Sequence, residues 1–314
     1  MTFSLEPDQL TDDALTDRVR ILQRRCGHRY SVDDVATAWI ALRAVGEAPQ
    51  VRSCLDLGCG IGSVLLMLAD RLPAARVVGV EAQAGSYALA ERNVERNRLK
   101  KRASVQFGDL RDCPLLDRIL QAEAAFGREA GFDLVTGTPP YKPVGTASLS
   151  PDPQRAHARV ELRGGVEAYL AAAARVLEPE GVFVMCAQSE LAPRVAAGAR
   201  AVHFAPIYRL DIVPRLAHKT RLFSVHVFVR ETARDGGAAV IARLAASGSA
   251  LVAAPEGENT VLERLALRDE AGERTPGARA LRAFFGMFDD TAGPKAHASQ
   301  LPPLKAAEHS DSVG

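Results

Sequence analysis

The sequence predicts an α/β protein with a doubly wound, mostly parallel sheet of seven strands and an antiparallel hairpin at one edge. Three observations predict this fold. Strand-like and helix-like segments alternate between residues 47 and 187, which is the pattern of βαβ units. A glycine-rich turn follows the first strand of that series, where such sheets commonly bind a ligand. Two later strand-like runs, Ile207–Val213 and Leu222–Val229, have a short link between them and should pair antiparallel.

The individual elements follow in order from the spacing of apolar residues. The expected strands are 51–57, 76–81, 103–107, 132–136 and 182–187, and the expected helices are 62–72, 84–99, 113–127 and 165–177. Before them, an apolar-periodic helix is expected from Val35 to about Val45, and Ser31 followed by Asp34 is a capping-box-like start for it. The stretch Val19–Gln23 is also typical of a helix.

The chain divides into four expected regions. These are an N-terminal arm and helix at 1–46, a sheet domain at 47–231, a C-terminal extension at 232–288 and a disordered tail at 289–314. The extension begins with an Ala/Gly-rich stretch at 233–260, which we interpret as an insertion, and the tail is rich in Ala, Pro and Ser.

Composition limits the possible classes of function. The 314 residues carry a formal net charge of +1, so no strong overall field draws the chain to nucleic acid or membrane. No apolar run is long enough to cross a bilayer, and the acidic N-terminus is unlike a signal peptide. The five cysteines form no C-x-x-C pair and no zinc-like cluster with the seven histidines, so we expect reduced thiols, no metal and a cytoplasmic monomer.

The glycine-rich turn has the features of a site for S-adenosylmethionine (SAM). Gly58, Gly60 and Gly62 form a G-x-G-x-G pattern with Ser63 next, whereas a dinucleotide fingerprint has G-x-G-x-x-G. The carboxylate of Asp56, at the end of the preceding strand, would repel a pyrophosphate and attract a cationic group. SAM carries a sulfonium and an ammonium group but no phosphate, so the sequence favours it as the cofactor.

Further cofactor contacts are expected beyond this turn. Glu81 ends the strand at 76–81 and is suited to the hydroxyls of a ribose. Asp109 follows the strand at 103–107 and could accept a hydrogen bond from an adenine amino group. Tyr30, in the arm, could form an aromatic wall if the arm covers the cofactor as a lid, although this turn could also serve only as the entry to a helix.

The acceptor would meet the cofactor where the strand at 132–136 ends. Pro139 and Pro140 fix the backbone there and remove two donors. The Thr138 hydroxyl and the Pro139 carbonyl are then available to accept hydrogen bonds from an amine, which would localise its lone pair and aim it at the methyl group. Tyr141 could stack on a base. Such catalysis uses orientation and electrostatics, with no metal or covalent intermediate; the alternative is a rigid strand-to-loop turn.

Two basic clusters could contact nucleic acid. Arg155, Arg159 and Arg163 follow a polar loop next to the predicted site, so we interpret them as phosphate contacts. The second cluster is more typical of a solvated helix face; its residues are Arg92, Arg96, Arg98, Lys100, Lys101 and Arg102.

Several of these segments occur together in one known family. They are Gly27–Ser31, Leu55–Gly62, Val80–Glu81, Pro139–Tyr141, Ser150–Pro151, Ala158–Glu161, Val213–Arg215 and Asp269–Pro276. From about Gly27 to Phe285, the chain resembles the bacterial valine-tRNA adenine-N6 methyltransferases, which methylate an adenosine beside the anticodon. The cofactor segments are shared by all similar methyltransferases. The arm, the stretch around Val160 and the late segment at 269–276 are more specific.

The resemblance implies a Rossmann-like class I methyltransferase whose methyltransferase domain is 47–231. It implies N6-methylation of adenine in RNA, with tRNA as the expected partner. Two positions depart from the family: Thr138 replaces an Asn, and Val160 replaces a His. Methylation of a protein glutamine amide or of a small-molecule amine is therefore an alternative, and a catalytically dead RNA-binding module is a third.

Overall fold

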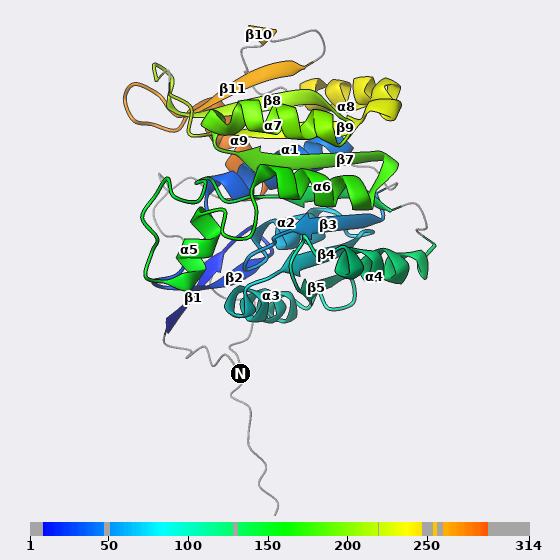
Figure 1. Cartoon of the computed structure of the whole chain (residues 1–314). Helices are drawn as coiled ribbons and strands as arrows, with labels where there is room; N and C mark the ends of the chain where they lie inside the picture. Colours follow the sequence, from blue (N-terminus) through cyan, green and yellow to red (C-terminus); the bar gives the residue numbers. More distant parts are fainter. Residues whose placement is uncertain are drawn as a thin grey trace, which may run out of the picture.

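The computed structural model describes residues 9–46, 51–127, 131–218, 220–246, 254–255 and 260–287. Its main feature is a nine-stranded sheet (Figure 1). From one edge to the other, the strands are β10 (Ala254–Pro255), β11 (Val261–Arg268), β8 (Phe204–Arg215), β9 (Phe223–Arg230), β7 (Leu177–Ala187), β6 (Phe132–Gly137), β3 (Ser53–Leu57), β4 (Arg76–Glu81) and β5 (Ala103–Phe107). Strands β5, β4, β3, β6 and β7 run parallel, whereas β9 is antiparallel to both of its neighbours.

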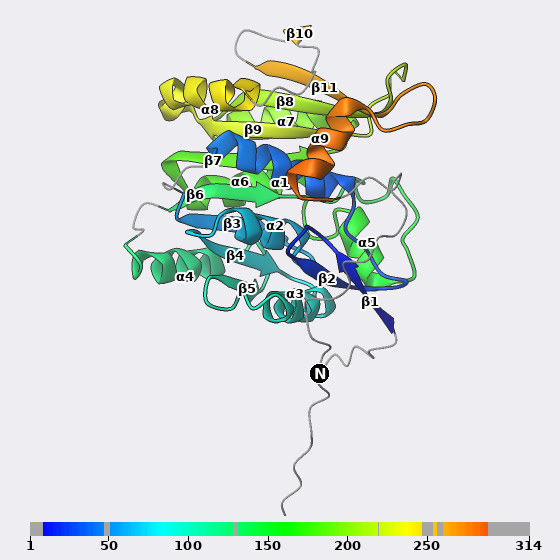
Figure 2. The same cartoon turned by 180° about the vertical axis from the view of Figure 1, so that it is seen from behind.

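Helices cover both faces of this sheet. They are α1 (Val32–Val45), α2 (Ser63–Arg71), α3 (Ala84–Arg96), α4 (Cys113–Ala124), α5 (Pro153–Arg159), α6 (Val166–Val176), α7 (Ala192–Ala201), α8 (Arg234–Ala246) and α9 (Pro276–Phe284). One apolar core joins α1, α2, α3 and α8 to the sheet, and a second core joins α4, α6 and α7 to its other face (Figures 1 and 2). The predicted doubly wound α/β fold is confirmed.

The edge of the sheet differs from our prediction. The β8–β9 hairpin is present, but β11 pairs parallel with β8 on its outer side, so the hairpin is not the edge. The stretch at 233–260, which we interpreted as an insertion, contains α8, whose Val240 and Leu244 are buried. A chain segment distant in sequence can extend a sheet, and its alternating pattern alone does not reveal its partner strand. The tail expected at 289–314 lies outside the described residues.

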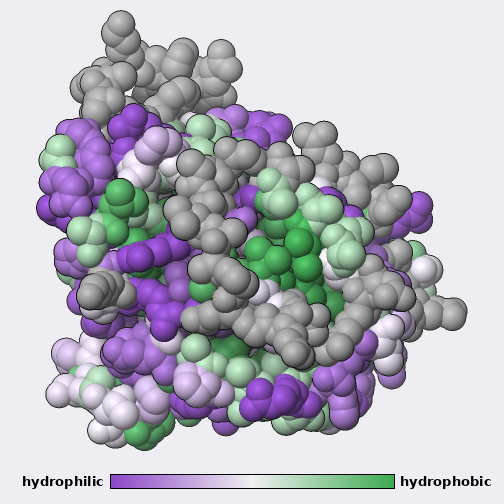
Figure 3. Space-filling view, turned by 90° about the horizontal axis from the view of Figure 1, so that it is seen from above, coloured by the Kyte–Doolittle hydropathy of each residue, from purple (hydrophilic) through white to green (hydrophobic). Residues whose placement is uncertain are grey.

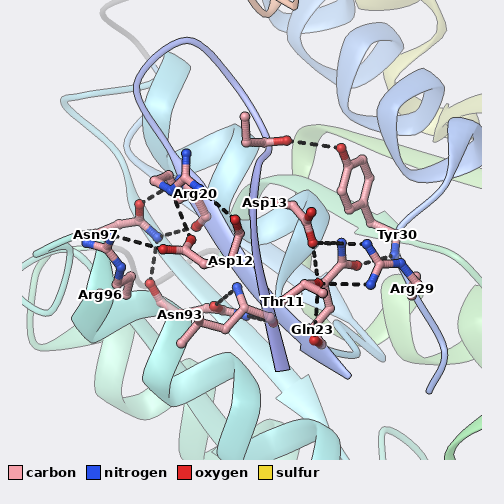
Figure 4. A network of polar contacts seen from close by, with 12 residues as sticks. Thr11, Asp12, Asp13, Arg20, Gln23, Arg29, Tyr30, Asn93, Arg96 and Asn97 are labelled. Atoms are coloured by element: carbon pink, nitrogen blue, oxygen red, sulfur yellow. Dashed lines mark hydrogen bonds and ion pairs between the residues drawn. The ribbon is translucent and has the colours of Figure 1, made fainter. Parts of the chain in front are cut away.

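The arm begins with a hairpin that we predicted wrongly. Residues Val19–Gln23 do not form a helix, because Arg20–Arg24 form strand β2, which pairs with β1 (Leu10–Ala14). A short apolar run fits a buried strand as well as a helix. Side-chain amides of α3 hold β2 in place: Asn93 bonds the backbone of Leu22 in both directions (2.6 and 3.0 Å), and Asn97 does the same for Arg20 (2.9 and 2.7 Å; Figure 4).

The end of the molecule formed by β11 and its neighbours carries both hydrophilic surface and an area of apolar surface (Figure 3). Within the described ranges, no helix combines the length and the apolar character that crossing a membrane requires.

Candidate active site

The parallel strands bring three predicted segments to the same edge of the sheet. Leu57, which ends β3, lies in register with Val80 on β4 and with Gly137 on β6. The glycine turn, Glu81 and Thr138 therefore leave their strands at one level. All three contribute to the lining of one cavity of about 110 Å³.

The glycine turn closes tightly and leaves an open surface at its centre. Gly58, Gly60 and Gly62 have φ values of 62°, 56° and 88°, a region that favours glycine. A Cβ added at Gly60 would meet no atom within 4 Å, whereas one at Gly58 would lie 2.2 Å from the Tyr169 hydroxyl. Gly60 thus presents its bare backbone to the cavity. Gly62 instead serves as the N-cap of α2.

Asp56 lies behind the turn and does not line the cavity. Its side chain is buried, with one carboxylate oxygen accepting from the Thr136 hydroxyl (2.8 Å) and the other from the Leu65 backbone N–H (3.2 Å). Burial raises the pKa of Asp56 to about 7. The Asp56 carboxylate thus links β3 to β6 and α2, and Asp56 would affect a bound cofactor indirectly, by positioning the glycine turn.

Glu81 and Asp109 do line the cavity. The Glu81 carboxylate accepts from the backbone N–H groups of Gly60 (2.9 Å) and Gln83 (2.6 Å), and burial raises its pKa to about 7. Asp109 accepts two hydrogen bonds from the Arg111 guanidinium (2.9 and 2.8 Å), which hold the pKa of Asp109 below its usual value. The two carboxylates therefore differ in their readiness to ionise.

A third carboxylate at the cavity, Asp34, was missed by our sequence prediction. It lies in the first turn of α1 and accepts from the Ser31 backbone N–H (3.0 Å). Burial, with the nearby Asp33 charge, raises the pKa of Asp34 well above its usual value. The capping-box pattern had accounted fully for this residue, and only the fold shows that α1 begins beside the glycine turn.

The arm covers one side of the cavity. His28 and Tyr30 both line it. Gln154, on α5, accepts from the His28 backbone N–H (3.1 Å) and donates to the Ser86 hydroxyl (3.2 Å). A Cβ added at Gly27 would lie 2.2 Å from the Gln154 side-chain oxygen, so the arm packs on α5 at this glycine with no space for a side chain.

The acceptor segment divides between the cavity and the layer behind it. Thr138 and Pro140 line the cavity, but Pro139 and Tyr141 do not. Within the described residues, the Thr138 side chain makes no hydrogen bond. The Tyr141 hydroxyl donates to Asp33 (2.8 Å), and its ring lies 6.5 Å from that of Phe223. The structure thus ties Tyr141 to α1.

Comparisons with known proteins agree with this arrangement. A family model described as "Methyltransferase domain" matches residues 54–136. A tRNA1(Val) (adenine(37)-N6)-methyltransferase of Porphyromonas gingivalis W83 is 34% identical over 160 residues, covering 51% of this chain and 58% of the relative. A protein of the same name from Bacteroides thetaiotaomicron is 31% identical, and the match covers 58% of this chain and 70% of that relative. The chain belongs to this methyltransferase family.

Other relatives have different acceptors in their names. A release factor glutamine methyltransferase of Geobacter sulfurreducens is 36% identical over 130 residues, covering 41% of this chain and 40% of that protein. Among solved structures, a predicted O-methyltransferase of Agrobacterium tumefaciens superposes with a TM-score of 0.50 at 16% identity, over 79% of this chain and 96% of that one. The last match supports the Rossmann-like methyltransferase fold alone.

SAM, the cofactor of such methyltransferases, fits the residues of the cavity. Among the described lining residues there are three acidic side chains, Asp34, Glu81 and Asp109, and one arginine, Arg163. Burial raises the pKa of Asp34 and of Glu81, and a ligand with two cationic groups would favour their ionised forms; carboxylates can also accept from ribose hydroxyls and an adenine amine. The open space at Gly60 lets a ligand approach the backbone closely.

The three predicted arginines of this methyltransferase lie in different surroundings. Arg163 lines the cavity 3.7 Å from the Asp109 carboxylate. Arg155 donates to the carbonyl of Gly27 in the arm (3.1 Å). Arg155 and Arg159 are exposed on α5, outside the cavity. The described residues contain no group of three His, Cys, Asp or Glu side chains that could hold a metal ion.

Proposed function

We propose that this methyltransferase transfers the methyl group of SAM to the exocyclic N6 amine of adenine in RNA, with tRNA as the first candidate. The observation that carries the proposal is that Thr138 and Pro140 share one cavity with Gly60, Glu81 and Asp109. A shared cavity supports a direct transfer, because the acceptor segment and the expected cofactor contacts both line it. The names of the relatives from Porphyromonas and Bacteroides support the choice of acceptor.

The chain's contribution would be to hold the two partners in line. SAM, when bound, supplies an electrophilic methyl group on sulfur. The Thr138 hydroxyl, which lines the cavity, would accept an N–H bond of the target amine, whose nitrogen would then carry a more localised lone pair. The Pro139 carbonyl, which the sequence offered as a second acceptor, belongs to a residue outside the cavity lining. Transfer would form the N–C bond as the C–S bond breaks, and the positive charge would pass from the sulfur to the amine, which would release its proton to solvent. Acceptors fixed in advance stabilise that developing charge.

Glutamine amide methylation is a second candidate. It is favoured by the similarity to the release factor glutamine methyltransferase, which is 36% identical over its matched part. An amide nitrogen has a delocalised lone pair, as an aryl amine does, so the same hydroxyl acceptor at Thr138 would serve it. A small-molecule amine would require the same chemistry without a macromolecular surface.

A transfer assay with radiolabelled SAM separates these candidates. The protein is incubated in parallel with total RNA, total protein and a small-molecule extract, and the label is followed in each fraction. We expect the label in RNA, on N6-methyladenosine after nuclease digestion. Label confined to protein or to small molecules would contradict the proposal, and SAM binding without transfer to any fraction would indicate a non-catalytic module.

A further inference from the structure

A second and larger cavity, of about 410 Å³, shares Tyr30 with the lining of the cofactor cavity. We refer to it as the arginine cavity. Four arginines line it, Arg29, Arg268, Arg274 and Arg282, against Asp13 as the one acidic residue of its lining. Arg29 forms an ion pair with Asp13 (2.9 Å), and the other three arginines of the lining belong to the C-terminal segment.

The cavity also has an apolar side. Its apolar lining residues come from α1, β11, α9 and the chain after α9, and they are Val32, Val35, Leu267, Leu281 and Met287. Its volume falls in the range of about 300–1,000 Å³ typical of small-molecule sites. An apolar wall, an aromatic ring and a basic rim together suit a base and its phosphate.

The cavity is formed where two segments distant in sequence meet. The arm supplies Arg29 and Tyr30, while β11 and α9 supply the opposite side (Figure 2). The late segment at 268–274 forms a backbone turn. Arg268 and Arg274 form an isolated antiparallel β-bridge, and the Asp269 N–H donates to the Glu273 carbonyl (2.8 Å). Both the arm and this segment were singled out in the sequence, and neither is explained by cofactor binding alone.

We propose that the arginine cavity binds the nucleotide next to the target adenosine in the RNA. This inference rests on the proposed function and names a substrate-binding site for it. The base would lie against Tyr30 and the apolar wall, and its phosphate would face Arg268 and Arg282. Because Tyr30 lines both cavities, a base in the arginine cavity would contact a residue that also lines the cavity of the proposed methyl transfer.

Binding of a fluorescein-labelled single-stranded RNA with one central adenosine tests the proposal. Its dissociation constant is measured for the full chain between about 50 and 200 mM salt. We expect Arg268→Gln to weaken binding several-fold and Arg268→Gln with Arg282→Gln to weaken it at least tenfold, with the salt slope reduced by about 0.7 for each lost phosphate contact. Arg264→Gln is the matched control, because Arg264 is an exposed arginine on β11 that does not line the cavity.

Controls separate this inference from the proposed function. Calorimetry should show unchanged SAM affinity in all variants, and thermal unfolding checks that each variant folds. If the double variant does not fold, the single variant Arg268→Gln still tests the site, because Arg268 is exposed. RNA with thiouridine beside the adenosine should cross-link to Tyr30 or Met287. If the parent, Arg268→Gln and Arg264→Gln all bind the RNA with equal affinity and methylate it equally, the proposed site is wrong and the proposed function still stands. RNA neither bound nor methylated would overturn both.

Discussion

Replacing Thr138 by Val tests how the acceptor is held. The change keeps the branched shape and removes only the hydroxyl. Among the described residues, that hydroxyl has no hydrogen-bond partner, and the side chain is half-buried. Its loss should therefore alter the free energy of unfolding by no more than about 0.5 kcal/mol. A hydrogen bond made only to the reacting amine is worth about 2–4 kcal/mol, so the methyl-transfer rate should fall roughly a hundredfold.

A matched control lies two residues earlier, within β6. The Thr136 hydroxyl is buried and donates to Asp56 (2.8 Å). Thr136→Val leaves that carboxylate with one partner fewer, so the free energy of unfolding should drop by about 1–3 kcal/mol. The two variants should thus show opposite signatures, one in rate and one in stability.

The assay is single-turnover methyl transfer to the acceptor identified in the transfer assay, with SAM affinity measured by calorimetry. We expect Thr138→Val to bind SAM as the parent does and to transfer slowly. A parental transfer rate in this variant would refute the role of the hydroxyl. Because Pro139 does not line the cavity, no second predicted acceptor would remain there, and amine methylation would lose its main support.

Three further predictions concern the cofactor. Asp34→Asn keeps the helix-capping acceptor but cannot ionise when a cationic ligand binds, so calorimetric SAM affinity should fall about tenfold or more; parental affinity would contradict a contact with the SAM ammonium. Gly60→Ala should cost about 1–2 kcal/mol of stability at φ 56° and weaken SAM binding, since its methyl group enters the cavity; intact affinity would refute that placement. Burial raises the pKa of Glu81 to about 7, so the fraction of Glu81 that is ionised and can accept from a ribose hydroxyl increases as the pH rises from 6 to 8. Over this range, SAM affinity should rise roughly tenfold in the parent relative to Glu81→Gln. Parallel pH profiles of SAM affinity in the two proteins would rule this role out.

The sequence predicted the central sheet well because its signal is local. The run from Cys54 to Leu57 is apolar apart from Asp56, and glycines follow at once, so strand, turn and helix were each visible. The stretch Val19–Gln23 had no such flanking signals. Its extended conformation is held in part by Asn93, which is distant in sequence and hydrogen-bonds to the backbone of Leu22. Pairing partners of this kind cannot be inferred from periodicity.

At the site, the types of the functional residues were easier to predict than the directions in which their side chains point. Glu81 and Asp109 were expected at strand ends and line the cavity. Asp56 was expected to face the ligand, but its bonds to Thr136 and Leu65 turn it into the core. Asp34 had a sufficient local explanation as a cap. Which carboxylate faces the cofactor depends on how α1 packs against the sheet, and that packing is a long-range property.

The first turn of α1 connects the cofactor side of the site to the acceptor side. Asp34 lines the cofactor cavity, and the adjacent Asp33 accepts from the Tyr141 hydroxyl of the acceptor segment (2.8 Å). The rest of α1 is buried, and it packs on β6, β7 and β9. A displacement of α1 would therefore move both sides together. Orientation catalysis needs such a rigid support, and here the buried helix α1, which follows the arm, provides it.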